Sequence, residues 1–403
     1  MAGLLSRLFG RAEAPAEART AGSSPPGYAA AFGVIPTAPG VHVTTRLAEN
    51  LATVSACVGA ISSTMASLPA YVYRRTASGR VELDVHPVAR LLRRPNAHQT
   101  WPDWMEWTMA QVLLHGNAVS AIEHDAAGRV VALRPLTWGA LQIFRLPSGR
   151  LAYDVVHDAS TGVRGAGVRR YFAEEVFHLR DRSDDAMIGR SRISRAPEVL
   201  GNASSLQEWS GAQWRNGTTL SGTLTTDAKV PKEAKDQIKQ DWNDRFAGPR
   251  NARQVAVMDQ GLKFQPISVS PEDAEVLASR RFTVEELCRL FQVPPPIVQD
   301  YTHNTFTNAA QASLWFAQIS LAPWARKIEA EFSRSVFGAS SADCFLEVDL
   351  SGLMRGDYEA RWKAHEIAVR NQILDTNEVR EIEGWNPRAA EPAPRPAQTP
   401  TVA

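Results

Sequence analysis

The sequence is poor in cysteine and has no motif that would pair its thiols. Its 403 residues include three cysteines, Cys57, Cys288 and Cys344, which lie far apart. No CxxC motif occurs, so neither a cysteine-based zinc site nor a thioredoxin-type redox site has support. We expect three free, buried thiols, as in proteins of a reducing compartment.

Long hydrophobic runs are also missing. The apolar stretch at residues 4–9 is short and contains Arg7, so it is too brief for the core of a signal peptide. No run of about 20 apolar residues follows. We therefore expect neither secretion by the usual route nor an association with the membrane.

The chain has almost no excess of charge of either sign. It has 44 Lys and Arg against 43 Asp and Glu, a net charge of +1. A free-standing nucleic-acid-binding domain usually has a basic excess. Any contact with DNA is therefore expected to be local or weak, or to follow from the shape of the protein rather than from a basic surface.

Motifs of enzymes and cofactor sites are absent. No GxxxxGK[ST] string is present to bind nucleotide phosphates, and no GxSxG string to expose a nucleophilic serine. His365 and Glu366 begin an HExxH pattern, but Val369 stands where the second histidine ligand would be. We expect no enzymatic activity, no cofactor and no metal site.

Two polar features receive a structural interpretation. Asp181, Asp184 and Asp185 could bind a divalent ion, but a solvated loop paired with Arg180 and Arg182 is the favoured interpretation. His178 has no identifiable nucleophile to serve and is interpreted as structural.

Most of the eleven tryptophans fall on apolar helix stripes, which favours core packing over ligand stacking.

Composition predicts disordered tails at both ends. Residues 1–40 are rich in Ala, Pro, Gly and Ser, and residues 388–403 contain four prolines.

Residues 41–195 have the pattern of an α+β unit. Apolar residues recur every three or four positions over 53–67, which predicts a helix. A second helix is expected over 100–114, with Thr100 as N-cap and Asp103 completing a capping box. Antiparallel strands are expected at 71–73 with 81–83, at 119–124 with 130–133, at 141–146 with 151–156, and singly at 169–179.

Helices dominate the remainder, so the fold class is α+β and mainly helical. Helices are expected over 197–215, 231–246, 271–291 (capped by Ser270), 308–336 (kinked at Pro323), 357–370 and 377–383 (with an Asp375–Glu378 capping box). Short strands are expected at 222–224 and 344–350, and a joined pair at 254–258 and 262–266. Pro294, Pro295 and Pro296 end the third helix.

Several segments together have a characteristic order along the chain. They are VSACVGAISSTMASLP at 54–69, LLRRPNAHQTWPDWMEW at 91–107, LLHGNAVSAIEHDAAGRVVALRPL at 113–136, EVFHLR at 175–180, IGRSRIS at 188–194, RNGTTLSGTL at 215–224, SPEDAEVLASRRFTVEELCRLFQVPPPIV at 270–298 and NEVREIEGWNP at 377–387. In this order, over residues 45 to 387, the chain resembles the portal protein family of long-tailed bacteriophages, prophages and gene transfer agents.

The resemblance implies a ring, usually of twelve subunits, around a duplex-wide channel at one capsid vertex. The ring would replace one pentamer of the major capsid protein and pass double-stranded DNA without sequence specificity. It would bind the terminase large subunit and then a head-tail adaptor, and it would belong to a virion or phage-like particle assembled in the bacterial cytoplasm.

The family architecture of wing, stem, clip and crown maps onto consecutive parts of the chain. The expected parts are the wing (41–195), a stem helix (196–216), the clip (217–270), a second stem helix (271–293), the tunnel loop (294–308), a long helix and strand returning to the wing (309–350) and a short crown (351–387). Family members often have Gly between the last two helices. Here Asn371 stands there, and it is expected to adopt the left-handed conformation of such a cap.

Charge then indicates which residues line the channel. Residues 270–300 hold six acidic residues and three arginines. Acids in the lumen would repel phosphates, whereas each Lys or Arg contact would slow sliding DNA. The candidate channel-lining acids are Glu272, Asp273, Glu275, Glu285 and Glu286.

The tunnel loop and the clip supply the other candidate sites. The loop residues without Lys or Arg, expected next to DNA, are Gln299, Asp300, Tyr301, Thr302, His303, Asn304, Thr305 and Phe306. Clip residues expected to bind protein partners are Lys232, Lys235, Lys239 and Arg245. Candidate ring contacts are Trp209, Trp214, Trp315 and Trp324. The basic residues of 163–195 could face packaged DNA or an acidic neighbour, and both remain open.

Two alternatives belong to other classes. One is a different capsid component, such as a head-tail adaptor, which would lack paired long helices around a small insert. The other is a hydrolase whose acidic residues are scattered in sequence.

Overall fold

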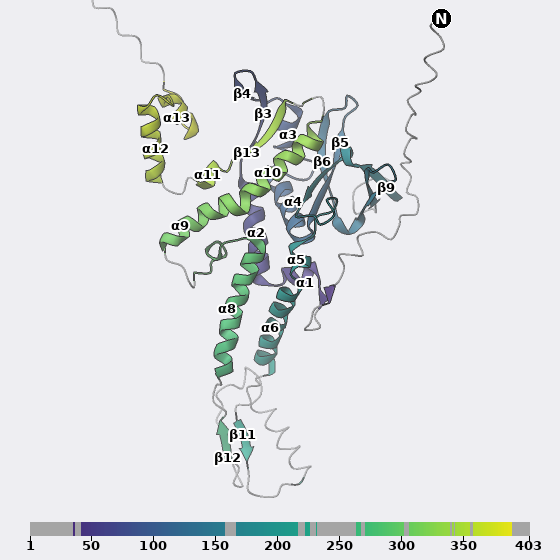
Figure 1. The fold of residues 1–403 in the computed structure, drawn as a ribbon, viewed down its shortest axis with the longest axis vertical. Coiled ribbons are helices and arrows are strands. Elements are labelled where there is room, and N and C mark those ends of the chain that lie inside the picture. Colours follow the sequence, from purple (N-terminus) through teal and green to yellow (C-terminus); the bar gives the residue numbers. More distant parts are fainter. Residues whose placement is uncertain are drawn as a thin grey trace, which may run out of the picture. The chain divides into compact units, whose positions relative to one another are not determined.

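The computed structural model of the chain describes residues 35–36, 42–157, 167–216, 222–225, 231, 263–266, 271–301, 306–338, 341, 343–354 and 358–388 (Figure 1). The chain divides into two compact units, residues 1–350 and residues 351–403. Each unit is described by itself below.

Two helices form the centre of the first unit. Helix α2 (Ala52–Ser67) follows the short α1 (Thr45–Glu49) and packs against α4 (Trp101–His115). Their apolar stripes are buried as the spacing predicts, with Cys57, Ile61 and Trp104 fully enclosed. The predicted capping box at Thr100 is confirmed, because its backbone N–H donates to Asp103 Oδ2 at 2.9 Å. Helix α4 ends at Gly116, whose φ is +80°.

The described residues of this unit also contain three antiparallel sheets of three strands. One has the order β10–β5–β6, with β10 at Val176–Arg180, β5 at Asn117–His124 and β6 at Val130–Leu136. The second is β13–β3–β4, with β13 at Cys344–Val348, β3 at Ala70–Thr76 and β4 at Gly79–Glu82. The third is β7–β8–β9, with β7 at Leu141–Arg145, β8 at Leu151–His157 and β9 at Gly167–Phe172. The predicted hairpins are confirmed.

The single strand predicted over 169–179 is wrong. It divides into β9, which pairs with β8, and β10, which pairs with β5 in another sheet. A 3-10 turn at Ala173–Glu175 separates them, and the Glu175 carboxylate accepts the Phe172 backbone N–H at 3.0 Å. This local bond turns the chain at Glu174 and Glu175, which separate two apolar stretches.

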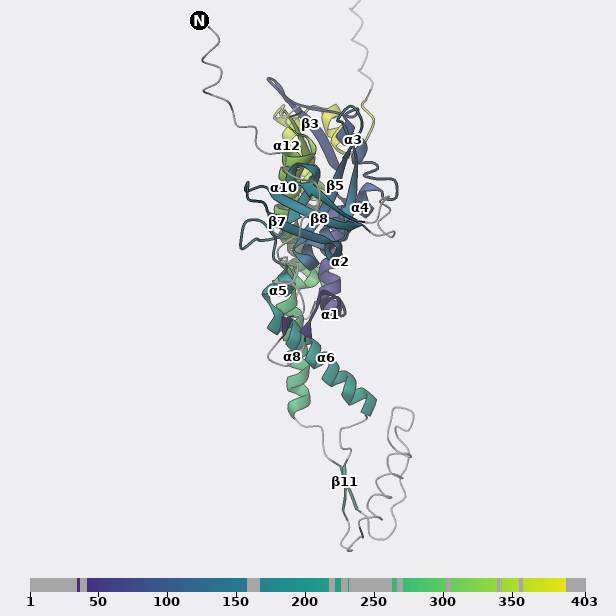
Figure 2. The same ribbon diagram turned by 90° about the vertical axis from the view of Figure 1, so that its right-hand side faces the viewer.

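Helices α6 (Pro197–Asn216) and α8 (Pro271–Phe291) pack against each other. Both views show them extending from the end of the unit that carries α1 and the short α5 (Arg192–Arg195) (Figures 1 and 2). Both helices agree with prediction, while Ser270 lies outside the described residues. Another short helix, α3 (Pro87–Leu91), lies beside β6.

The segment between the two helices is described only in part. Strands β11 (Gly222–Thr225) and β12 (Lys263–Pro266) pair antiparallel. The strand expected at 262–266 therefore pairs with the segment after α6. The helix expected over 231–246 and the strand expected over 254–258 fall on residues outside the described part, apart from Pro231. A further short pair joins β1 (Ile35–Pro36) to β2 (His42–Val43).

The long helix expected over 308–336 is interrupted. It consists of α9 (Phe306–Trp315), a π-helical segment (Phe316–Leu321), α10 (Ala322–Glu331) and a second π-helical segment (Phe332–Val336). Pro323 lies just after the first π segment. Proline has no N–H to donate and clashes with the preceding turn, which accounts for wider turns at this point.

The second unit contains α11 (Ser351–Met354), α12 (Tyr358–Arg370) and α13 (Thr376–Ile382). The Asp375–Glu378 capping box is confirmed. The expected left-handed conformation at Asn371 is wrong, because the residue with φ +56° is Gln372. Helix α12 continues through one more hydrogen bond, Asn371 N–H to the Ile367 carbonyl at 3.0 Å, and so turns one residue later.

Within the described residues, no helix is long and apolar enough to cross a membrane. All three cysteines are free and buried, as expected.

Candidate functional site

The two long helices α6 and α8 carry most of the predicted site residues, and a small set of contacts fixes their position. The helices contact each other, and Ala203, Leu206, Val284 and Leu287 line one pocket beside this contact. Farther from the sheets, the Arg280 guanidinium donates to Ser210 Oγ at 3.5 Å. The two helices therefore form one antiparallel pair.

Arg192 ties the beginning of this pair to its end. It lies at the start of α5, pairs with Asp181 at 3.1 Å and donates to the Phe291 carbonyl at 2.6 Å. Its guanidinium also lies over the Trp324 ring, 5.7 Å from the centroid. Sequence reasoning missed this residue, because its partners Phe291 and Trp324 lie about 100 and 130 positions farther along the chain.

All five candidate channel-lining acids lie on α8. Glu285 pairs with Arg289 at 2.6 Å, one helical turn on, which reduces its effective charge toward solvent. Glu286 is half-buried. The side chains of Glu272, Asp273 and Glu275 lie outside the described residues. That these acids face a channel stays a prediction.

The candidate tunnel loop is shorter than expected. The range 294–308 begins with a 3-10 helix, Pro295–Val298, which ends at Gln299 with φ +65°. Asp300 donates its backbone N–H to the Pro295 carbonyl at 3.0 Å, and Tyr301 is 58% exposed. Residues 302–305 (Thr302, His303, Asn304 and Thr305) lie outside the described part. Phe306 belongs to α9, so its assignment to the loop is wrong.

The acidic loop after β10 is a structural feature, as interpreted, but its partners differ from those expected. Asp184 pairs with Arg195 at 2.7 Å and Arg190 at 3.2 Å, rather than with Arg180 or Arg182. These pairs hold the pKa of the Asp184 carboxyl below its usual value, chiefly through the hydrogen bond from Arg195. The described residues contain no group of three or more potential metal ligands.

His178 is enclosed at the centre of a polar network. Its Nδ1 lies 3.0 Å from the Tyr153 hydroxyl and its Nε2 lies 3.0 Å from Asn117 Oδ1. Its backbone N–H donates to Glu331 at 2.8 Å. Burial, with Arg180 and Arg334 nearby, holds the pKa of His178 well below its usual value. The residue is structural, joining β10, β8, β5 and α10.

His178 should make the protein less stable in acid. The folded state keeps this imidazole neutral, whereas the unfolded state takes up a proton below about pH 6.5. The contribution of His178 to the free energy of unfolding is therefore fully present above that pH. Below it, this contribution falls by up to about 1.4 kcal/mol per pH unit. We expect His178→Gln to flatten the dependence of the denaturation midpoint on pH between pH 6.5 and 5. An unchanged slope would contradict this assignment. Because burial also lowers the pKa values of His86 and His115, the difference between variants isolates His178.

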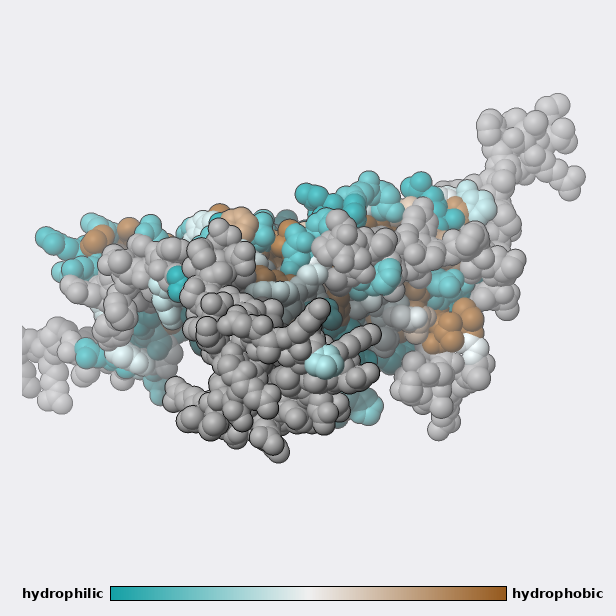
Figure 3. Space-filling view, turned by 90° about the horizontal axis from the view of Figure 1, so that it is seen from below, coloured by the Kyte–Doolittle hydropathy of each residue, from teal (hydrophilic) through white to brown (hydrophobic). Residues whose placement is uncertain are grey.

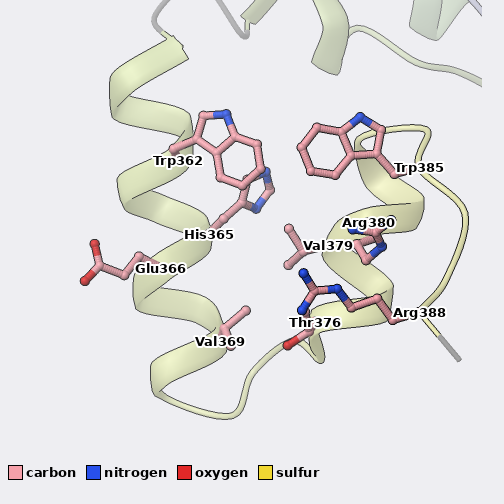
Figure 4. A pocket seen from close by; sticks show the side chains of 9 residues that line it. All are labelled: Trp362, His365, Glu366, Val369, Thr376, Val379, Arg380, Trp385 and Arg388. Atoms are coloured by element: carbon pink, nitrogen blue, oxygen red, sulfur yellow. The ribbon is translucent and has the colours of Figure 1, made fainter. Parts of the chain in front are cut away.

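In the second unit, a pocket of about 320 Å³ lies between α12 and α13 (Figure 4). Trp362 and Trp385 face each other across it, with ring centroids 5.7 Å apart. His365, which begins the incomplete HExxH pattern, has its Nε2 2.9 Å from Glu383 Oε1, and Arg361 donates to the same carboxylate at 2.8 Å. This histidine thus holds the helix pair together.

The four candidate ring-contact tryptophans separate into different environments. Trp209 and Trp315 are 43% and 49% exposed and remain available for a partner. Trp324 is buried in the first unit, so its assignment to an interface is wrong: it lies beneath Arg192 and Lys327. The side chain of Trp214 lies outside the described residues, as do Lys232, Lys235, Lys239 and Arg245.

Seen from the end that carries α6 and α8, hydrophobic residues break a mainly hydrophilic surface as separate patches (Figure 3). Sequence reasoning overlooked one of the exposed residues, Phe282 on α8, which is 56% exposed. A signal in the sequence existed, because Phe282 directly follows Arg280 and Arg281 and stands on the opposite side of the helix from Val284.

Comparisons with known proteins agree on one family. A family model described as "Phage portal protein" matches residues 52–384. The chain is 30% identical to the probable portal protein of Streptomyces phage phiC31, over 96% of this chain and 86% of that protein. It is 28% identical to the portal protein of Enterobacteria phage HK97, over 84% of this chain and 79% of that protein. Among solved structures, a chain in the neck of a native gene transfer agent particle, computed with C12 symmetry, superposes with a TM-score of 0.60. It is 20% identical and covers 85% of this chain and 93% of its own length.

Proposed function

The chain belongs to the phage portal protein family, and from that premise we propose that twelve copies form a closed ring at one vertex of a phage or gene transfer agent capsid. The ring surrounds a channel through which double-stranded DNA enters during packaging, is retained, and later leaves. The protein performs no chemistry of its own in this role and needs no cofactor.

The antiparallel pair of α6 and α8 is the observation that carries this proposal. The pair is joined at its start and end by Arg192, and the strands β11 and β12 pair across the insert between them. A compact pair of this kind, repeated by rotation, encloses a hole. The C12 symmetry of the similar neck structure supports twelve copies.

The charge of α8 suits a wall along which DNA slides. Among its acids, Glu286 has no arginine partner within the described ion pairs, whereas Glu285 is paired with Arg289. Carboxylates in a channel repel phosphates, so the duplex gains little affinity for the wall and is not held at one place. Residues 299–305 supply soft polar contacts without base readout, since they contain no Lys or Arg.

Partners at the two ends of the ring follow from the same proposal. The insert 217–270 faces the packaging motor, the terminase large subunit, and after packaging the head-tail adaptor. Four of its basic residues, Lys232, Lys235, Lys239 and Arg245, contact these proteins. Residues 41–195 contact the major capsid protein around the opening in the shell.

The mass of the purified protein tests the ring. We expect sedimentation or mass photometry to give a species near twelve times the 44.2 kDa of the chain, independent of dilution over a tenfold range. Obligate interfaces of about 2,000 Å² or more would account for this persistence. A monomer at all concentrations, in a preparation whose circular dichroism shows folded protein, would contradict the proposal.

A further inference from the structure

Two large aromatic side chains stand exposed on the stem pair, here defined as helices α6 and α8. Trp209 on α6 is 43% exposed and Phe282 on α8 is 56% exposed. Among the described residues of these helices, they are the large hydrophobic side chains that remain exposed. One ring face of Phe282 lies near the Arg289 guanidinium, 5.8 Å from the centroid.

The two side chains lie at nearly the same height along the stem pair. The Arg280–Ser210 hydrogen bond, and the pocket that Leu206 and Val284 share, place these parts of the two helices opposite each other to within about one helical turn. Trp209 precedes Ser210 by one residue and Phe282 follows Arg280 by two. Since the helices run in opposite directions, both steps lead toward the sheets, by about 1.5 Å and 3 Å at the helical rise per residue.

The two side chains also point away from the contact between the helices. Val284 faces α6, and at about 100° per residue Phe282 stands roughly 160° around α8 from it. Trp209 is turned by about 100° from Ser210, so it lies to the side of the α6–α8 contact. A disulfide requires Cα atoms within about 7 Å, and positions with these directions would not meet that limit inside one chain.

A closed ring relates its copies by rotation about one axis, and rotation leaves the height of every atom along that axis unchanged. Such head-to-tail rings need two different surfaces on each copy that complement each other. Two exposed aromatic residues at one height on the two helices of the pair meet this requirement. Exposed polar residues at that height on only one of the two helices would not provide two complementary surfaces.

We propose that Trp209 of one copy packs against Phe282 of the next, so that an aromatic contact between stem pairs closes the ring. The inference rests on the ring of the proposed function and names its contact. It also orients α8: Phe282 faces the neighbour rather than the lumen, where a phenyl ring would stay exposed to water. Glu286, about 40° around the helix from Phe282, then lies at the edge of the interface nearest the channel.

Cysteine cross-linking of the full-length protein tests the contact. Trp209→Cys and Phe282→Cys are combined in one chain, and the assembled protein is oxidised. A ladder of covalent oligomers up to the complete ring is expected on a non-reducing gel. Cys57, Cys288 and Cys344 are 0%, 1% and 7% exposed, so they should not contribute. Each single variant, which has no partner thiol in a head-to-tail contact, should remain a monomer on the gel.

Mixing the two single variants sharpens the result. Rings assembled from both should give covalent dimers and nothing longer, because each subunit then carries one of the two thiols. A matched control combines Phe282→Cys with Asn202→Cys, which is exposed on α6 but lies about 10 Å nearer the sheets. This control should give no ladder. A ladder from a single variant, or an internal disulfide without a ladder, would overturn the proposal.

A photo-crosslinking amino acid with an aromatic ring, p-benzoyl-phenylalanine at position 282, gives a second measurement if the cysteine variants fail to assemble. Its adduct should map to the α6 peptide around Trp209 of another copy. Rings seen by electron microscopy with adducts elsewhere would refute this contact while leaving the ring intact. Absence of rings from the unmodified protein would instead refute the proposed function.

Discussion

Particles whose portal subunits carry Gly and Ser in place of residues 301–305 are expected to assemble normal shells but to retain little DNA. These residues follow the 3-10 helix that holds Asp300, and Tyr301 is exposed there. If the segment touches the duplex, its side chains limit backward slipping by steric and polar contact. We expect packaged DNA per particle to fall by roughly tenfold, since such contacts position DNA without reading sequence. Quantitative PCR on nuclease-treated particles measures the packaged DNA per particle.

Tyr301→Phe is the matched control, because it keeps the ring and removes one hydroxyl. Its particles should fill nearly as well as those of the wild type. The replacement starts after Asp300 and ends before α9, so the helix begins unchanged at Phe306. Particles with the full replacement that fill and hold DNA normally would remove the loop from the account.

Gly189→Ala is expected to prevent folding or to lower the thermal midpoint sharply. A Cβ atom at Gly189 would stand 2.0 Å from the Gly116 carbonyl oxygen and 2.8 Å from the Asp181 backbone nitrogen. Both neighbours are backbone, held by the Asp181 N–H bond to Gly116 O at 2.9 Å. Backbone displacement of this kind costs about 3 kcal/mol or more. At about 2.1 cal/mol/K of unfolding entropy per residue, this cost in a unit of 350 residues lowers the midpoint by about 4 °C or more at a fixed protein concentration.

Gly59→Ala is the control for that substitution. Gly59 lies inside α2, and nothing stands within 4 Å of where its Cβ would be. Alanine in a helix interior should stabilise by about 0.5–1 kcal/mol. Differential scanning fluorimetry compares the two. Equal midpoints for both variants would show that the Gly116–Gly189 crossing is looser than described.

Local signals explain why the helices could be predicted. Thr100 and Asp103 cap α4 through contacts three residues apart, and the apolar spacing of α2 depends on nothing beyond its own turns. The Asp375–Glu378 box is equally local. The end of α8 before the predicted proline stop is also local, because Gln292 takes a left-handed conformation and the Val293 N–H donates to the Cys288 carbonyl at 2.9 Å.

Features set by distant contacts could not be predicted in this way. Residues 169–179 are predicted to form one strand because apolar side chains lie on both sides of Glu174 and Glu175. Glu175 instead divides the segment, and its two halves join different sheets. Trp324 looked like an interface residue, but Arg192 covers its ring from far along the chain. Whether a helix face meets a neighbour or a channel depends on the other copies, which one sequence does not contain.

The orientation of α8 in the assembled ring tests the central claim most directly. Electron cryomicroscopy of the purified oligomer should show a closed ring with α8 along a central channel, residues 299–301 near its narrowest point, and Trp209 beside Phe282 of the next copy. A ring with residues 271–301 on its outer rim, or a folded particle of one copy without a channel, would contradict the account.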